Sequence, residues 1–168
     1  ATDEKCPFSI EIFAGSPDDN NANFFYGGAM DTLKPYLDSG VLVVKSGQSE
    51  FGKVAIQGWD QAKAQSRMDD LLTPTYQDDK VQGVLAANDA LARGAINAMT
   101  NAGYTAADIP PVTGQDAEAA SVKLIVEGLQ YSSIFKDTRK LAAQSVLAAQ
   151  DLLQDKAPEA NDTETYNN

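Results

Sequence analysis

The chain has 168 residues, of which 43% are hydrophobic, and this suits a globular domain whose core is large enough to fold without crosslinks. Its net charge of −11 makes nucleic acid and anionic membranes poor partners. Histidine is absent and Cys6 is the single cysteine. Their scarcity excludes an internal disulfide and most nucleophilic triads and zinc sites, so an enzyme is disfavoured.

Short apolar runs typical of strands alternate along the chain with helical patterns. The segments expected to be strands are 8–14, 41–45, 81–87, 111–114 and 131–135. The segments expected to be helices are 20–38, 54–72, 89–101, 117–127 and 138–155. This alternation is typical of right-handed βαβ crossovers. The sequence therefore predicts an α/β fold with an open, mostly parallel five-stranded sheet and helices on both faces.

Polar side chains follow each predicted strand. In open parallel sheets ligands bind outside the carboxyl ends of the strands, so these residues are the first candidates for a site. They comprise Asp18, Asp19, Asn20, Asn21, Gln48, Glu50, Phe51, Asn88, Asp89, Gln115, Asp116, Lys136 and Asp137. Glycine-rich phosphate-binding motifs are absent. Amides and carboxylates can each hold adjacent hydroxyls, and an aromatic ring can stack on a sugar, so the set indicates a neutral polyol site.

Several of these residues also have a structural interpretation. Asp and Asn are favoured helix N-caps, each contributing about 1 kcal/mol. We predict Asp19 and Asp89 as caps, which would leave Asn88 facing the cleft. Asp116 can serve as a cap, as a ligand, or as both. Trp59 falls within the apolar stripe of the predicted helix 54–72 and is interpreted as a packing residue.

A second class of protein fits the same strand pattern. Phosphoacceptor receiver-like signalling domains bind Mg²⁺ with acidic residues after the first and third strands, and use a Thr or Ser and a Lys after the next two. Asp18, Asp19, Asp89, Thr113 and Lys136 occur here in comparable order. Against this alternative, "GSP" separates the acidic pair from its strand, and Asp89 leads into a helix instead of projecting from a strand end.

Five motifs carry a resemblance to a known family: "IFAGSPDDNNA", "AANDA", "VTGQDAEAASVK", "FKDTRKLA" and "NDTETY". They closely resemble the multiple-monosaccharide- and xylose-binding branch of the type I periplasmic binding proteins, the solute receptors of sugar ABC transporters. The resemblance implies a non-catalytic receptor without a cofactor, for a monosaccharide of the xylose, glucose or galactose type. It also implies a periplasmic or extracytoplasmic location, although this chain shows no signal peptide, and a membrane permease as partner.

The resemblance assigns sugar-binding roles motif by motif. Asn20 of "DDNNA", Asn88 of "ND" and Asp116 of "GQDA" would contact the sugar, and Lys136 of "FK" would reach it from near the hinge. Phe51 would be a stacking aromatic residue.

The resemblance also implies a domain organisation. Family members have two lobes that close on one sugar. Residues 1–136 would be most of the second lobe, incomplete at its start, and residues 137–168 would be a helix and polar tail that pack on the missing first lobe. When that lobe is absent, we expect the apolar stripe of helix 138–155 to find a substitute for it, through self-association or a shifted packing. The stripe consists of Leu141, Leu147, Ala148 and Leu152.

Overall fold

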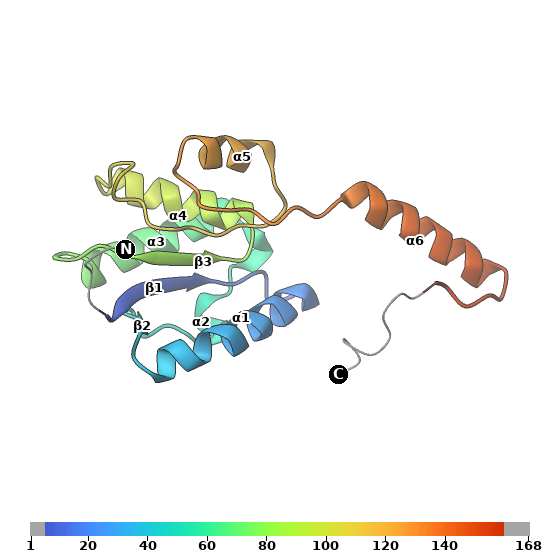
Figure 1. Ribbon diagram of the computed structural model, residues 1–168, viewed down its shortest axis with the longest axis horizontal. Coiled ribbons are helices and arrows are strands. Elements are labelled where there is room, and N and C mark those ends of the chain that lie inside the picture. Colours follow the sequence, from blue (N-terminus) through green and yellow to red (C-terminus); the bar gives the residue numbers. More distant parts are fainter. Residues whose placement is uncertain (1–5, 160–168) are drawn as a thin grey trace. The chain divides into compact units, whose positions relative to one another are not determined.

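Strand β1 (Phe8–Phe13) forms the centre of a parallel sheet in the computed structural model of the chain, which describes residues 6–159. Its neighbours are β2 (Leu42–Val44) and β3 (Gly83–Ala86), in the order β2-β1-β3 (Figure 1). Ile10 lies opposite Val44 on one side and Gly83 on the other. The predicted α/β fold with an open parallel sheet is therefore confirmed, whereas the expected count of five strands is wrong.

The fourth and fifth expected strands are reduced to isolated parallel bridges. Val112 bridges to Val84, and Ile134 bridges to Gln115. Pro110 and Pro111 precede Val112 and lack backbone N–H donors. Beyond Val112, the hydroxyl of Thr113 takes over the pairing, since it accepts from Ala86 N at 3.0 Å and donates to Ala86 O at 3.1 Å. These segments continue the parallel pairing by single bridges, without forming regular strands.

Helices follow the strands as the alternation predicts, with one exception. The helices are α1 (Asn20–Asp38), α2 (Phe51–Val54), α3 (Gln61–Thr75), α4 (Asp89–Asn101), α5 (Ala119–Val126) and α6 (Thr138–Leu153). The expected helix 54–72 is wrong in its first third. Gly58 and Trp59 have φ of 74° and 54° within a 3₁₀ turn, and the Asp60 carboxylate then caps α3 by accepting from Lys63 N at 2.8 Å.

The sheet separates two apolar clusters, because successive side chains of a strand point to opposite faces. Phe13 is fully buried in the larger cluster, which α3 and α4 cover. Ile12 is buried in the smaller cluster on the side of α1 (Figure 1). Gly94 lets α3 and α4 approach closely, since a Cβ at this position would lie 2.4 Å from the carbonyl oxygen of Gln61.

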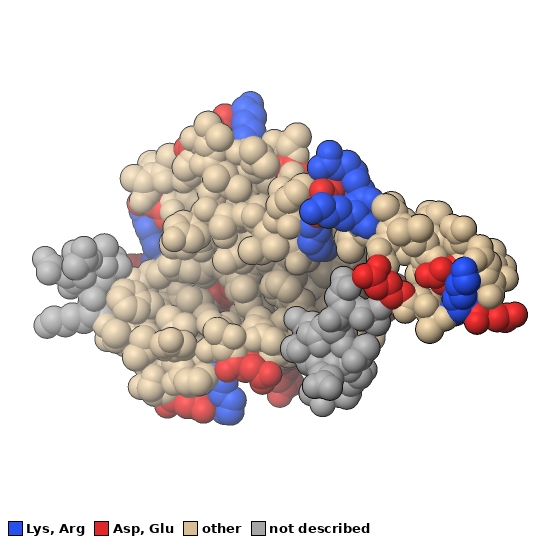
Figure 2. Space-filling model, turned by 45° about the vertical axis from the view of Figure 1, so that its right-hand side comes forward, with Lys and Arg blue, Asp and Glu red and all other residues tan. Residues whose placement is uncertain are grey.

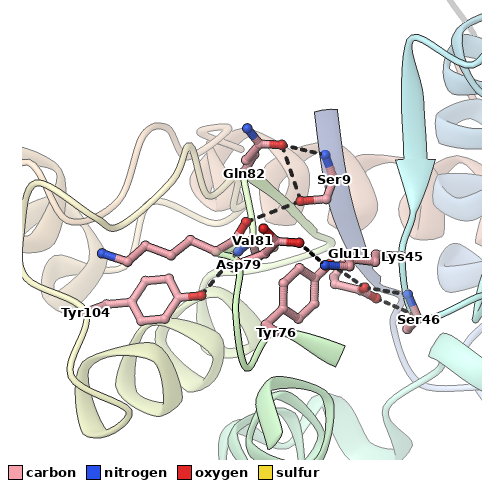
Figure 3. Close-up of polar contacts among 10 residues, drawn as sticks. Ser9, Glu11, Lys45, Ser46, Tyr76, Asp79, Val81, Gln82 and Tyr104 are labelled. Atoms are coloured by element: carbon pink, nitrogen blue, oxygen red, sulfur yellow. Dashed lines mark hydrogen bonds and ion pairs between the residues drawn. The ribbon is translucent and has the colours of Figure 1, made fainter. Parts of the chain in front are cut away.

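A fully buried carboxylate lies on the same face of β1 as Phe13. Glu11 accepts hydrogen bonds from Tyr76 Oη at 2.7 Å, from Ser46 N at 3.1 Å and from Ser46 Oγ at 2.7 Å (Figure 3). Burial, together with the neighbouring Glu11, raises the pKa of Tyr76 far above its ordinary value, so its hydroxyl remains a donor. The guanidinium of Arg67 lies over the Phe13 ring, 5.1 Å from its centroid.

The chain divides into two units, residues 1–135 and 136–168. The second unit contains α6, which Asp137 caps by accepting from Arg139 N at 3.1 Å. No residue of α6 is buried, and Leu141, Leu147 and Leu152 are all more than half exposed. Across residues 6–159, none of the helices combines the length and apolar character of a membrane span.

The Tyr76→Phe substitution should destabilise the fold by about 1–3 kcal/mol, because it removes a donor from a buried carboxylate. Tyr36→Phe is the matched control, since this ring is exposed and its hydroxyl lies outside the Glu11 network. Urea unfolding of both variants measures the difference. Equal stability of the two variants would show that the hydroxyl of Tyr76 contributes nothing to holding Glu11.

Candidate functional site

Three chain segments end side by side at the carboxyl edge of the sheet. The backbone N–H of Ala87, after β3, donates to Phe13 O of β1 at 3.0 Å. The N–H of Asp89 donates to Gln115 O, after the Val112 bridge, at 2.9 Å. Two backbone hydrogen bonds therefore place Asn88 and Asp116 on neighbouring tips of one edge, as the sequence predicts for residues that follow parallel strands.

Asn88 and Asp89 have roles that reverse the prediction. Asn88, not Asp89, is the N-cap of α4, and its Oδ1 accepts from Leu91 N at 3.0 Å. The backbone explains this, since Asn88 is extended (φ −149°, ψ 176°) and Asp89 is already the first helical residue. Capping occupies only the carbonyl oxygen of Asn88, so the amide Nδ2 still offers two N–H donors to a ligand.

Asp116 lies in a strained loop and does not cap a helix. Its φ is 104° and that of Ala117 is 51°, in the left-handed region that disfavours residues with a Cβ. Helix α5 starts later, with Glu118 at its N-cap position, so the capping interpretation of Asp116 is wrong. Such strain costs about 1–3 kcal/mol per residue and is concentrated at functional sites. It therefore singles out Asp116 among the candidate residues.

Asn20 follows β1 at the same carboxyl edge. It is the exposed first residue of α1, and Asp19 caps that helix by accepting from Asn21 N at 2.9 Å, as predicted. The other oxygen of Asp19 accepts from Trp59 Nε1 at 3.2 Å. The amide of Asn20 is thus presented next to a carboxylate that already has two donors.

Trp59 lies at the tip of β1, where the sequence analysis did not place it. A Cβ on Gly15 would lie 2.0 Å from the indole ring, so the ring covers the backbone directly after the strand. The side chain is half-buried. The signal that could have located it is the pair Gly58 and Asp60, a turn residue and a helix cap on either side of the tryptophan.

The remaining two candidates lie in different surroundings. Phe51 is half-buried in the smaller core cluster, and its ring makes an edge-to-face contact with Tyr26 at 5.3 Å between centroids. Lys136 is the exposed first residue of the second unit and directly precedes the α6 cap Asp137. The structure thus brings Asn20, Asn88 and Asp116 to one edge, and gives Phe51 a packing role.

The contacts of Asp89 weigh against the receiver-like alternative. Among residues 6–159 there is no cluster of three or more His, Cys, Asp or Glu side chains that could hold a metal ion. Asp89, the acceptor in the receiver-like alternative, is fully buried and both of its oxygens accept hydrogen bonds. Uncharged residues make up most of the visible face of the first unit in Figure 2. Such a surface suits a neutral ligand.

Comparisons with known proteins show the family to which the chain belongs. A family model described as "Periplasmic binding protein domain" matches residues 2–157. The chain is 53% identical, over 99% of its length, to the "Multiple sugar-binding periplasmic receptor ChvE" of Rhizobium radiobacter, and 36% identical over 90% to the "D-xylose-binding periplasmic protein" of Escherichia coli. It covers 48% and 43% of these two relatives, so the chain spans about half the length of the curated relatives it matches.

A solved structure supports the same assignment. The ABC transporter solute binding protein of Clostridium phytofermentans with bound β-D-glucose superimposes with a TM-score of 0.89 at 50% identity, over 98% of this chain and 51% of that one. The α/β fold therefore matches one lobe of a solute-binding protein. The chain belongs to the periplasmic binding protein domain family. Its resemblance to the multiple-sugar and xylose-binding members is confirmed by these relatives.

The Asp116→Gly substitution should raise the free energy of unfolding by about 1 kcal/mol, because glycine adopts positive φ without strain. Asp31→Gly, within α1, is the control. It should lower the free energy of unfolding by about the same amount, because a glycine in a helix loses more backbone entropy when the chain folds. Chemical denaturation measures both variants. A loss of stability in Asp116→Gly would show that the loop is not strained by the aspartate.

Proposed function

We propose that this chain is part of the substrate-binding component of a sugar ABC transporter. It binds a monosaccharide of the xylose, glucose or galactose type at the carboxyl edge of the sheet, and it performs no chemical step. The observation that carries the proposal is the placement of Asn88 and Asp116 on adjacent strand tips, with Asp116 in a strained conformation. The sugars named for its relatives, xylose and glucose, support the substrate class.

The residues supply complementary hydrogen-bonding groups. Asn88 offers two N–H donors, Asp116 offers carboxylate acceptors, and the exposed amide of Asn20 offers both. The resemblance also assigns a sugar-binding role to the ammonium group of Lys136, which belongs to the second unit. A sugar hydroxyl both donates and accepts, so adjacent hydroxyls can pair with this set. A sugar that lacks one hydroxyl leaves a protein group unpaired, which is the basis of discrimination between sugars.

An aromatic ring completes the proposed site. The resemblance points to Phe51, but its ring packs against Tyr26, whereas Trp59 covers the tip of β1 next to Asp19. We therefore include Trp59 as the ring that the geometry favours for stacking on the sugar. As the single tryptophan of the chain, it also reports binding directly by fluorescence.

The two parts of the chain have different proposed roles. Residues 1–136 form a sugar-binding lobe, and 137–168 form a helix and tail that pack on another lobe of an intact receptor, which works outside the cytoplasm with a membrane permease. Residues 160–168, which include the whole "NDTETY" motif and most of the polar tail, lie outside the described residues. Because one lobe supplies one wall of the cleft, sugar affinity of this chain alone should be far below that of a closed receptor.

We also propose that α6 pairs with a second copy when no other lobe covers it. Leu141 and Leu152 are 56% and 63% exposed on one side of the helix, with the small side chain of Ala148 between them. An antiparallel pair would bring the two stripes together and remove these leucines from water.

Asn88→Ser should weaken sugar binding at least tenfold, which corresponds to about 1.4 kcal/mol. Serine keeps the helix cap but removes the amide donors. Asn97→Ser, on the exposed side of α4, is the matched control and should bind as the unmodified chain does. Titrations of D-xylose, D-glucose and D-galactose, followed by Trp59 fluorescence and calorimetry, measure this.

Three outcomes of these titrations are informative. An absence of binding for all three sugars, even at high millimolar concentration, would contradict the proposed function. Tight binding by this chain would contradict the single-wall argument. A fluorescence change upon binding that is lost in Phe51→Leu, while Trp59→Phe binds normally, would return the stacking role to Phe51.

Leu141→Glu with Leu152→Glu should convert the chain from a dimer to a monomer, because two charges would enter the apolar stripe of α6. Ala143→Glu with Gln150→Glu adds the same charge on the opposite side of the helix and should leave the dimer intact. Light scattering of the three proteins decides this. A monomer without any substitution would refute the self-association.

A further inference from the structure

We propose that Asp89 is a positioning residue, whose buried carboxylate fixes the Asp116 loop relative to Asn88. This inference rests on the proposed sugar site and adds to it the means by which two ligand residues on different segments are held in register. Asp89 was expected to be a helix cap. Because Asn88 takes the cap, the carboxylate of Asp89 is directed to other partners.

Both oxygens of this carboxylate are bonded to segments distant in sequence. Oδ2 accepts from Glu118 N at 2.8 Å, and Oδ1 accepts from Gln130 Nε2 at 3.0 Å. Gln130, which is 2% exposed, donates from the same nitrogen to Ser132 O at 3.1 Å. One side chain at the start of α4 thereby joins the loop before α5 to the segment after it.

The two hydrogen bonds of the Asp89 carboxylate, from Glu118 N and Gln130 Nε2, form a tie between the two segments, and burial makes this tie strong. Asp89 is 0% exposed, and a buried charge is strongly destabilising unless its hydrogen bonds are made. The two donors shown are a backbone N–H and an amide, and the N-terminus of α4 adds a favourable dipole because Asp89 is in its first turn. Loss of either donor would leave charge unsatisfied in the interior, so the two segments are held firmly at the distance the carboxylate sets.

The tie acts directly on the strained backbone. The bonded N–H of Glu118 comes right after Asp116 and Ala117, the two residues with positive φ. On the other side of the loop, Asp116 N donates to Ile134 O at 2.9 Å and Ala117 N donates to Ser133 Oγ at 2.9 Å. A strained conformation persists only where its surroundings hold it from several sides, and Asp89 supplies one of these holds.

Two neighbouring features support this role. Gly114 packs against the tie, since a Cβ there would lie 2.2 Å from Asp89 Oδ1 and 2.5 Å from Gln130 Nε2. One turn along α4, Arg93 forms an ion pair with Glu118 at 2.6 Å and donates to Ser121 Oγ at 2.9 Å. The start of α4 is thus connected to the loop by a buried carboxylate and a more exposed guanidinium.

An exchange of the two interacting groups tests the inference. Asp89→Asn turns an amide NH₂ toward one of two donors, so the amide NMR signals of Asp116 to Glu118 should shift and affinity for D-glucose should fall at least tenfold. Gln130→Glu alone opposes two carboxylates and should act in the same direction. The double variant Asp89→Asn/Gln130→Glu restores a donor–acceptor pair between positions 89 and 130, while Ser132 O still lacks its donor. It should therefore recover part of the loop signals and part of the affinity that the single variants lose, a coupling that independent sites do not show.

Glu11→Gln is the matched control, because it makes the same change at another fully buried carboxylate of the sheet. It should lower stability and leave the signals of Asp116 to Glu118 unchanged. If Asp89→Asn does not fold, Gln130→Met, which removes one donor only, replaces it and should still shift these signals.

Two results would overturn the inference: loop signals unchanged when the tie is broken, or a double variant no better than the single ones. If the unmodified chain binds no sugar while the signals respond as described, the proposed function fails and the positioning of the loop by Asp89 stands.

Discussion

The close approach of three segment ends at one edge of the sheet is the constraint on which the rest of the structure depends. Two backbone hydrogen bonds, from Ala87 to Phe13 and from Asp89 to Gln115, set the spacing of these tips. Ladder hydrogen bonds between regular strands cannot set it alone, because the Val112 and Ile134 segments pair only by single bridges. Polar side chains therefore help to set a spacing that a longer ladder of backbone hydrogen bonds would otherwise set.

Two buried carboxylates show how this is achieved. Glu11 lies within β1 and binds Ser46 after β2, while Asp89 lies after β3 and binds the loop before α5. Each carboxylate joins its own strand to a less regular neighbouring segment. Each also accepts a hydrogen bond from a further side chain, Glu11 from Tyr76 and Asp89 from Gln130. Hydrogen bonds to a buried carboxylate form only at one spacing of its partners, so they favour one arrangement of these segments. The fold thus uses buried charge where the sheet is weakest.

How far the sequence could predict the molecule follows from the range of the forces involved. Helix 89–101 was predicted with both ends correct, because its signals are local: a polar residue after a strand, an apolar period, and Gly103 beyond the end. The packing of Phe51 was not predictable, since a contact with Tyr26 decides it. The position of Trp59 was missed, although Gly58 and Asp60 beside it are a turn residue and a helix cap. The roles of Asn88 and Asp89 were reversed for a related reason. Either can cap by its chemistry, and only the buried partners of Asp89 distinguish them.

The strain at Asp116 bears on how the proposed sugar site can be prepared in advance. With one wall only, water competes with a sugar for the polar groups of the proposed site, so replacing it gains little free energy. When a second wall excludes water, the same groups become costly to leave unpaired, and a mismatch of one hydroxyl is then penalised. Discrimination between sugars therefore requires donors and acceptors that are already at their final spacing. The free energy of rearranging them on closure would otherwise offset the free energy gained by pairing with the correct sugar. A strained aspartate loop fixed to the neighbouring strand tip by a buried carboxylate supplies such a spacing before any ligand arrives.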